Sequence, residues 1–314
     1  MEILSRCKKN SVRVWNALCA FGSAQWQRSA LGVMLLWCLL ILCLSGLLGD
    51  WFDWLLMNNS ERVVFIQTVA FLVPCIIYLI KGKSLELFSL RPIPRRQLSV
   101  VVMYSLVIAT CSLFLVTLTT LIVGSADDSN VSYVSVVGGS MTQIGLFAGA
   151  IFPALCEELL MRGAILTELR PAGRIAALLS GVFFAMLHGS AANFVGPLLA
   201  GWVYGMLTLH YASIIPAIIA HLVYNTYLLV LSQMLMLFTG NDVIFFIYLV
   251  NVAILFCSIY GIIIYYEKNQ LDTPLWRQDK LELPDGQWLK KTLLSWPFAL
   301  FVVLFIVRMV SGLL

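Results

Sequence analysis

Long apolar runs separated by short polar segments dominate the hydropathy pattern of this chain. A membrane span needs roughly 20 predominantly apolar residues. Nine runs meet or approach that length, and they cover 30–48, 63–80, 98–123, 141–169, 174–190, 194–209, 213–238, 243–266 and 293–312. Helices are expected because every backbone polar group must be satisfied inside lipid. The pattern predicts an all-α, polytopic transmembrane helix bundle of about nine spans, forming one integral membrane domain over residues 1–314.

Two parts of the pattern differ from the other runs. The run 194–209 is short and contains Pro197, so it is the least regular span. The segment 267–292 is too polar to cross lipid and is predicted to form an amphiphilic loop. The run 293–312 then adds a C-terminal span.

Composition supports a chain surrounded by the lipid bilayer. Hydrophobic residues make up 61% of the 314 positions and charged residues 11%, whereas soluble domains contain about 25% charged residues. The net charge of +4 is small and dispersed, which argues against nucleic-acid binding. The 8 cysteines include no C-x-x-C pair, and we expect them to act as small buried hydrophobes.

Basic residues predict the orientation. Seventeen of the 20 lysines and arginines lie in the N-terminal segment or in the loops after the second, fourth and eighth runs. Loops rich in lysine and arginine stay in the cytoplasm. The N-terminus and the loop 267–292 are therefore predicted to be cytoplasmic and the C-terminus exterior. The style of the sequence suggests a bacterial cytoplasmic membrane.

Ionisable and strongly polar residues break the apolar pattern mainly in the fourth, fifth and seventh runs. Such residues are costly in lipid and are functional candidates by default. They are Glu157, Glu158, Arg162, His188, His221 and Asn225. With a helical rise of about 1.5 Å per residue, the polar residues of the three predicted helices lie at a similar, intermediate depth in the membrane. A shared site needs such a common depth.

Local spacing separates the two adjacent glutamates. Glu158 and Arg162 are four residues apart, so they share a helix face and can pair, while Glu157 faces elsewhere. His221 and Asn225 also share a face. A glutamate–arginine pair can also be a purely structural clamp, and a membrane histidine can simply bond a neighbouring carbonyl.

Proline and glycine positions add two structural expectations. Pro153 cannot donate to the carbonyl of Gly149, so the helix either opens just before the glutamates or has an ordinary kink. The pairs Gly145/Gly149 and Gly201/Gly205 have G-x-x-x-G spacing, and close helix packing accounts for both.

Three motifs in these runs resemble the CPBP family of intramembrane proteases, which includes CAAX prenyl proteases and bacteriocin-processing enzymes and is also called the Abi family. The family motifs are E-E-x-x-x-R, F-x-x-x-H and H-x-x-x-N. Here they read Glu157-Glu158-Leu159-Leu160-Met161-Arg162, then Phe184-Ala185-Met186-Leu187-His188, then His221-Leu222-Val223-Tyr224-Asn225. The resemblance covers about 141–230, within the motif-bearing spans 141–238.

The resemblance implies an endopeptidase that hydrolyses a peptide bond in a membrane-associated peptide or protein. It implies that Glu157 activates the attacking water with His188. Glu158, held by Arg162, would support the site. His221 and Asn225 would stabilise the oxyanion of the tetrahedral intermediate.

A metal is an alternative to direct catalysis by glutamate. Glu157, His188 and His221 are also the ligand types of some catalytic zinc sites. No H-E-x-x-H motif is present, and zinc on Glu157 would leave Glu158 as the base although Arg162 engages it. We therefore favour a reaction that requires no cofactor, with zinc as the alternative.

Two other classes of function compete with the protease. One is a non-catalytic peptide-binding scaffold or bacteriocin-immunity protein, which complete motifs do not favour. The other is a transporter in which buried glutamate and histidine relay protons. A transporter predicts broken helices in inverted repeats, and the sequence contains no convincing internal repeat.

Overall fold

The computed structural model describes residues 29–55, 57–81, 89–123, 142–189, 194–237, 241–271 and 284–311, and every regular element in these ranges is a helix. The predicted all-α fold class is confirmed. Within the described ranges, seven helical stretches have the length and composition to cross a membrane, and they are Ser29–Leu47, Asn59–Ile80, Arg95–Leu115, Gln143–Glu168, Arg170–His188, Ile215–Leu235 and Asp242–Asn269. The protein is therefore a multi-pass membrane protein.

The exact number of spans stays a prediction. The predicted sixth run is the helix α11, Val195–Tyr211, of 17 residues. Its length of about 26 Å, at roughly 1.5 Å per residue, is below the ~30 Å of a hydrocarbon core. The predicted last run is the second arm of a bent pair, Gly286–Leu293 and Trp296–Val310, which meet at 62°.

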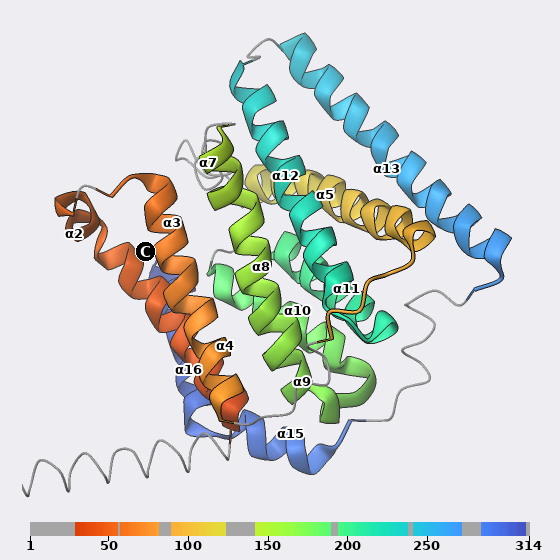
Figure 1. Cartoon of the computed structure of the whole chain (residues 1–314). Helices are drawn as coiled ribbons and strands as arrows, with labels where there is room; N and C mark the ends of the chain where they lie inside the picture. The colour runs from red at the N-terminus through yellow and green to blue at the C-terminus, as the bar shows by residue number, and fades with distance from the viewer. Residues whose placement is uncertain are drawn as a thin grey trace, which may run out of the picture.

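A central helix carries the two glutamates, and other helices surround it on several sides (Figure 1). This helix is α8, Phe152–Glu158, and it packs against α3, Asn59–Gln67, and α12, Ile215–Leu237. Two helices that pack on each other, α10 (Ala176–His188) and α11, lie behind it. The helices α5, Arg95–Val123, and α13, Asn241–Asn269, contact each other, and α5 also packs on α12.

The fourth predicted span is interrupted by widened turns on both sides of the glutamates. After α7, Gln143–Leu146, comes the π-helical segment η2, Phe147–Ile151, in which the amide of Phe152 donates to the carbonyl of Phe147. A second one, η3, Leu159–Ile165, precedes the short α9, Leu166–Glu168. Pro153 is the second residue of α8, two residues after the end of η2, so the helix widens just before the glutamates. π segments inside α-helices are frequent at functional sites.

A similar widened turn interrupts the second predicted span. The π segment η1, Thr68–Leu72, joins α3 to α4, Val73–Ile80, and Pro74 lies at the start of α4. Gln67 is the last residue of α3, directly before η1. Both widened helices therefore carry polar side chains beside the widened turn.

Close packing of α10 and α11 depends on glycine, as predicted for one of the two G-x-x-x-G pairs. A Cβ on Gly201 would lie 2.7 Å from the Cα of Gly181, and one on Gly205 would lie 3.1 Å from the Cα of Ala177. The expectation is wrong for Gly149, where a Cβ would meet nothing within 4 Å. Gly149 lines a cavity, so this glycine leaves space beside the glutamates.

Part of the predicted loop 267–292 is helical. The helix α15, Gly286–Leu293, begins at Asp285, whose carboxylate accepts from the backbone of Gln287 and Trp288 at 2.9 and 3.2 Å. The amide of Asp285 donates to the carbonyl of Pro171 at 2.9 Å. Pro171 lies in the 3₁₀ helix η4, Arg170–Ile175. Two basic segments thus lie side by side, and the side of the membrane they face stays a prediction.

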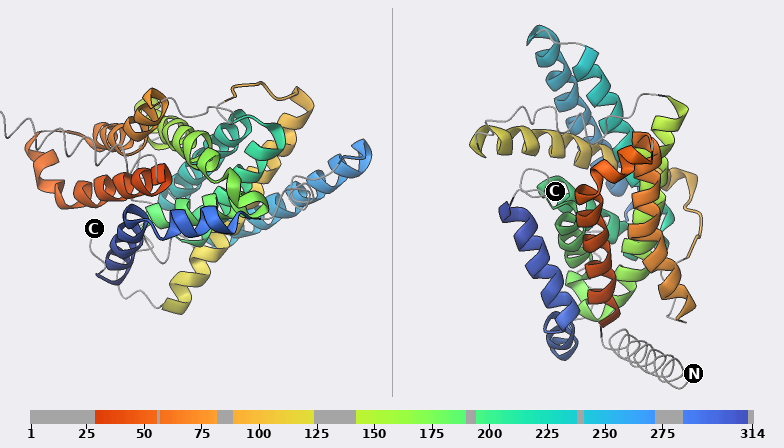
Figure 2. Two further views of the ribbon diagram at one scale, coloured as in Figure 1. Left: turned by 90° about the horizontal axis from the view of Figure 1, so that it is seen from below. Right: turned by 90° about the vertical axis from the view of Figure 1, so that its left-hand side faces the viewer.

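The last helix, α16, Trp296–Ser311, packs against α10 and the helix Ser29–Leu47 (Figure 2, right). The rings of Phe298 and Phe301 lie 5.5 and 6.4 Å from that of Phe183. The hydroxyls of Ser295 and Ser29 hydrogen-bond at 2.9 Å. This helix is therefore fixed on the bundle near its start.

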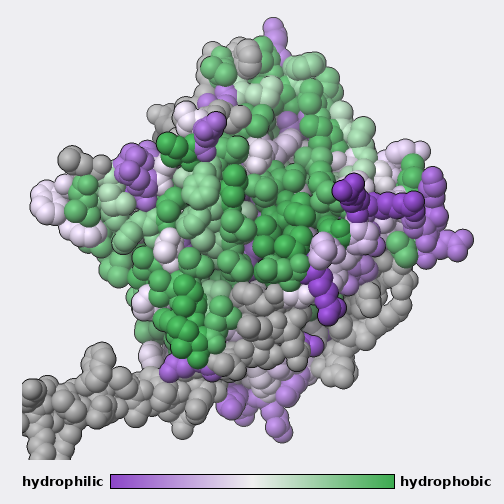
Figure 3. All heavy atoms as spheres, in the orientation of Figure 1, coloured by the Kyte–Doolittle hydropathy of each residue, from purple (hydrophilic) through white to green (hydrophobic). Residues whose placement is uncertain are grey.

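Hydrophobic atoms cover most of the face seen in Figure 3, and hydrophilic residues gather mainly at the lower end and the right-hand edge. Large apolar side chains such as Phe245, Phe256 and Tyr260 of α13 are 65–70% exposed. Among the described cysteines, all are free, four are buried, Cys111 is partly buried and Cys257 is exposed. Cys7 and Cys19 lie outside the described residues. The apolar face suits contact with lipid.

Candidate active site

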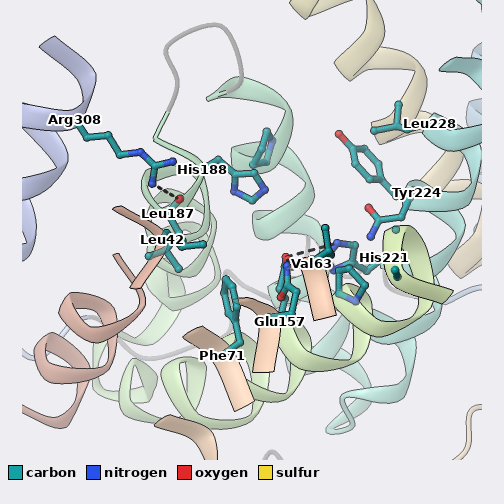
Figure 4. Close-up of a pocket in the computed structure, with 16 residues that line it drawn as sticks. Leu42, Val63, Phe71, Glu157, Leu187, His188, His221, Tyr224, Leu228 and Arg308 are labelled. Carbon is teal, nitrogen blue, oxygen red and sulfur yellow. Dashed lines mark hydrogen bonds and ion pairs between the residues drawn. The ribbon is translucent and has the colours of Figure 1, made fainter. Parts of the chain in front are cut away.

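A cavity of about 330 Å³ lies between α3, α8, α10, α12 and α16 (Figure 4). Four of the six residues predicted from the sequence line it: Glu157, His188, His221 and Asn225. The other two, Glu158 and Arg162, are fully buried and connect to this wall through His221. The structure thus brings all six to one place, although they come from three separate motifs.

Glu158 and Arg162 form the ion pair that their spacing predicts. A guanidinium nitrogen of Arg162 lies 2.9 Å from Oε1 of Glu158, and both side chains are 0% exposed. A second nitrogen of Arg162 donates to the carbonyl of Gly201 at 2.9 Å. Its guanidinium carbon lies 5.1 and 5.3 Å from the ring centres of Phe184 and Tyr204. Cation–π contacts of this kind are strongest where water is excluded.

Glu158 has a second partner that the sequence did not predict. Nδ1 of His221 lies 2.7 Å from the same Oε1 of Glu158, and because an ionised carboxylate only accepts, Nδ1 donates. The imidazole also stacks on Tyr204, with ring centres 5.3 Å apart and planes at 29°. These contacts fix the ring so that its other nitrogen, Nε2, faces the cavity side.

Glu157 points in a different direction from Glu158, as the helix geometry predicts. Its side chain lines the cavity and is 7% exposed. Oε1 accepts from Nε2 of Gln67 at 2.8 Å, and Oε2 lies 3.9 Å from Nε2 of His221. That second distance is too long for a hydrogen bond, so Oε2 stays open to a small molecule such as water.

His188 bonds a carbonyl and still presents a free nitrogen. Its Nδ1 lies 2.8 Å from the carbonyl oxygen of Phe184. A carbonyl only accepts, so Nδ1 carries the hydrogen and Nε2 of the neutral ring holds a lone pair. The expectation that a membrane histidine bonds a neighbouring carbonyl is met here, but His188 also lines the cavity.

Asn225 lies one helical turn from His221 on α12 and lines the same cavity. No described residue forms a hydrogen bond with its side-chain amide. The amide is therefore available to a ligand in the cavity.

Two polar residues of the cavity were missed by the sequence analysis. Gln67 lies in the predicted span 63–80, and Arg308 lies in the predicted span 293–312. Both break the apolar pattern of their run, and the rule that identified the motif residues applies equally to them. Neither residue lies in a recognisable motif, so the only sequence signal for them is a polar residue within an apolar run.

The residues predicted as alternative zinc ligands do not form a binding group in this arrangement. No set of three or more His, Cys, Asp or Glu side chains in the described residues is arranged to hold a metal ion. Nδ1 of each histidine contacts the protein, that of His221 with Glu158 and that of His188 with a backbone carbonyl, and Nε2 of each stays on the cavity side, so zinc remains the alternative expectation. We therefore derive no step through a metal.

Comparison with known proteins identifies the motif-bearing segment. Residues 140–227 match the family model described as Rce1-like, type II CAAX prenyl endopeptidase. No curated protein and no solved structure matches the chain significantly. The match contains all three motifs that build the glutamate and histidine walls of the cavity. The resemblance to the CPBP family is thereby confirmed over residues 140–227, the part of the chain that the Rce1-like model matches.

Proposed function

We propose that this protein is an intramembrane endopeptidase that hydrolyses a peptide bond of a membrane-associated peptide or protein, with Glu157 as the general base. One observation carries the proposal. Of two adjacent buried glutamates, Glu158 is engaged by two cationic or protonatable partners, Arg162 and His221, whereas Glu157 keeps an oxygen open to the cavity.

Glu157 and His188 are suited to activate water. Oε2 of Glu157 and Nε2 of His188 are both acceptors in the cavity wall, and in this proposal one water donates a hydrogen to each. Gln67 orients the carboxylate through its bond to Oε1. Glu157 takes the proton as the water oxygen bonds to the peptide carbonyl carbon. A positioned general base contributes about 10²–10⁴-fold to the rate.

His221 is suited to stabilise the oxyanion as an imidazolium. Its Nδ1–H is committed to Glu158, so Nε2 can donate only when the ring is protonated. A neutral His221 would leave Glu157, Glu158 and Arg162 with one uncompensated negative charge. Buried charges without compensation are costly, so a protonated His221 balances the cluster and supplies a donor beside Asn225.

Collapse of the intermediate completes the reaction. The carbon–nitrogen bond breaks, the oxyanion becomes a carboxylic acid, and the proton held by Glu157 passes to the leaving amine. Donors aimed at the oxyanion in a water-poor site are worth about 3–4 kcal/mol each in comparable hydrolases. Asn225 and His221 are the two donors in this proposal.

The substrate is a peptide that reaches the cavity from the membrane. The family description names a CAAX prenyl endopeptidase, and that activity belongs to the family. For this chain, we propose that it lies in a bacterial cytoplasmic membrane and cleaves a membrane-associated peptide. A cavity of about 330 Å³ is at the small end of the ~300–1,000 Å³ range of ligand sites, so it holds a short extended segment.

The experiment compares membrane peptides from cells that make the wild type with those from cells that make Glu157→Ala. We expect a set of cleavage products that depends on the wild type, and purified protein should then cut one of these peptides in detergent. Identical peptide sets, together with no cleavage by the purified wild type, would leave a peptide-binding scaffold as the better explanation.

A further inference from the structure

Among the residues that line the cavity, Arg308 alone comes from the last helix, and like Gln67 it lies outside the matched residues 140–227. Its side chain extends from α16 across to Leu187, on the same side of the cavity as His188 (Figure 4). An arginine inside an apolar helix is costly and marks a functional site by default. The family motifs give Arg308 no role.

The guanidinium of Arg308 is poorly partnered. Its hydrogen bond to the carbonyl of Leu187 is 3.5 Å long, its other polar contact is with the thiol of Cys43, and its buried Nε, like that of Arg162, has no partner among the described residues. Arg162, which is fully buried whereas Arg308 is partly buried, has a carboxylate, a carbonyl and two aromatic rings. A guanidinium has five N–H donors, so most of those on Arg308 are free for a ligand.

Its charge is also unbalanced. No described carboxylate forms an ion pair with Arg308, and its near neighbours are the thiol of Cys43, the carbonyl of Leu187 and Gly189, which are all uncharged. With His221 protonated, as in the proposed mechanism, the cluster of Glu157, Glu158, Arg162 and His221 balances without it. The cavity wall therefore has a surplus positive charge that an anionic ligand would compensate.

The backbone makes room for this side chain. Gly189 ends α10 with a φ of 62°, and a Cβ there would lie 2.3 Å from Nε of Arg308. Any other residue would have to displace the guanidinium and would also be strained at this φ. Packing of α16 on Phe183 fixes the helix from which Arg308 extends.

We propose that Arg308 binds a carboxylate of the substrate peptide, so that the enzyme selects peptides with an acidic group within a few residues of the scissile bond. Arginine suits this role because its planar fork binds a carboxylate through two parallel hydrogen bonds. The carboxylate is either the free C-terminus of the peptide or an aspartate or glutamate side chain. This inference rests on the proposed peptidase function for its biological meaning, while binding tests it separately.

The test measures binding to the full-length Glu157→Gln protein in a neutral detergent, so that no turnover intervenes. Three pools of fluorescein-labelled apolar hexapeptides are compared by fluorescence anisotropy. One pool ends in a free carboxylate, one in an amide, and one in an amide preceded by glutamate. We expect the free-acid or the glutamate pool to bind at least about tenfold tighter than the plain amide, and whichever does so identifies the source of the carboxylate.

Variants assign the preference to Arg308. Adding Arg308→Gln should reduce binding of the preferred pool to that of the plain amide, and Arg308→Lys should keep part of the preference because it keeps charge but loses the fork. Arg62→Gln is the matched control, since Arg62 pairs with Asp53 and does not line the cavity. Melting temperatures verify that all variants are folded.

The inference is overturned if the plain amide binds within twofold of both acidic pools, if no pool binds saturably, or if the preference survives Arg308→Gln. Turnover distinguishes this from failure of the proposed function. Wild-type cleavage without any preference for acidic peptides would reject the Arg308 site and keep the peptidase. Acid-selective binding that depends on Arg308, with no cleavage by the wild type, would reject the peptidase and keep the site.

Discussion

The two sides of the cavity use the same types of side chain in opposite ways. On the paired side, Glu158 contacts both Arg162 and His221, at 2.9 and 2.7 Å, and all three side chains are buried. On the open side, Glu157, His188 and Arg308 line the cavity and keep donors or acceptors without partners.

The difference follows from helix geometry. Adjacent residues on a helix point about 100° apart, so one glutamate can face a neighbouring helix while the next faces a cavity. A buried ion pair with good geometry holds its members in fixed positions, and losing one partner leaves an uncompensated charge. The paired side can therefore position His221, and the open side can exchange protons with water and substrate.

The largest expected effect is on turnover when the open side loses its base. Glu157→Gln should lower kcat by at least about 10³-fold, since glutamine cannot take a proton and base catalysis alone contributes about 10²–10⁴-fold. The shape and the bond from Gln67 are kept, so the melting temperature should hardly change. Cleavage of a membrane peptide and thermal unfolding in detergent measure the two effects.

Glu157→Gln that retains activity, combined with a stable but inactive Glu158→Gln, would mean that the two sides are assigned the wrong way round. Activity in both variants would reject the protease itself.

Substitutions on the paired side should lower the stability of the folded protein. Glu158→Gln should destabilise the protein by about 3–5 kcal/mol, because it leaves Arg162 as a buried unpaired charge, and Arg162→Ala should have a similar effect. Activity should be lost in both variants. Thermal unfolding in detergent, with the wild type beside it, gives the shift.

The double variant Glu158→Gln with Arg162→Gln provides the control. It removes both charges, so it should recover part of the stability and none of the activity, since His221 loses its acceptor. A double variant no more stable than either single variant would show that the pair is not what stabilises this side.

A smaller effect is expected from Gln67, which acts on the reaction only through Glu157. Gln67→Leu should lower kcat about tenfold, by removing a hydrogen bond to a charged acceptor worth about 1.5–3 kcal/mol, and should leave KM nearly unchanged. Oε1 of Gln67 is buried without a partner, so leucine should not lower the melting temperature. A fall in stability with unchanged kcat would make Gln67 a structural residue.

The smallest effect is expected from a chelator. Activity after dialysis against a strong chelator should stay within about twofold of the starting value, because the proposed base is a carboxylate rather than a metal-bound water. Stoichiometric zinc in the purified protein, with activity lost on chelation and restored by zinc, would favour the metal alternative.

The sequence predicted the helical class and the six motif residues because lipid makes polar residues within spans costly and therefore conspicuous. It also predicted the contact between Glu158 and Arg162, since four residues on one helix fix that distance. Only the tertiary structure decided which groups meet across helices. His221 bonds Glu158, Gln67 bonds Glu157, and Arg308 enters the cavity from the last helix. These contacts depend on how the helices pack and on how each is rotated about its own axis. When the whole circumference of a helix is apolar, hydropathy gives almost no information about that rotation.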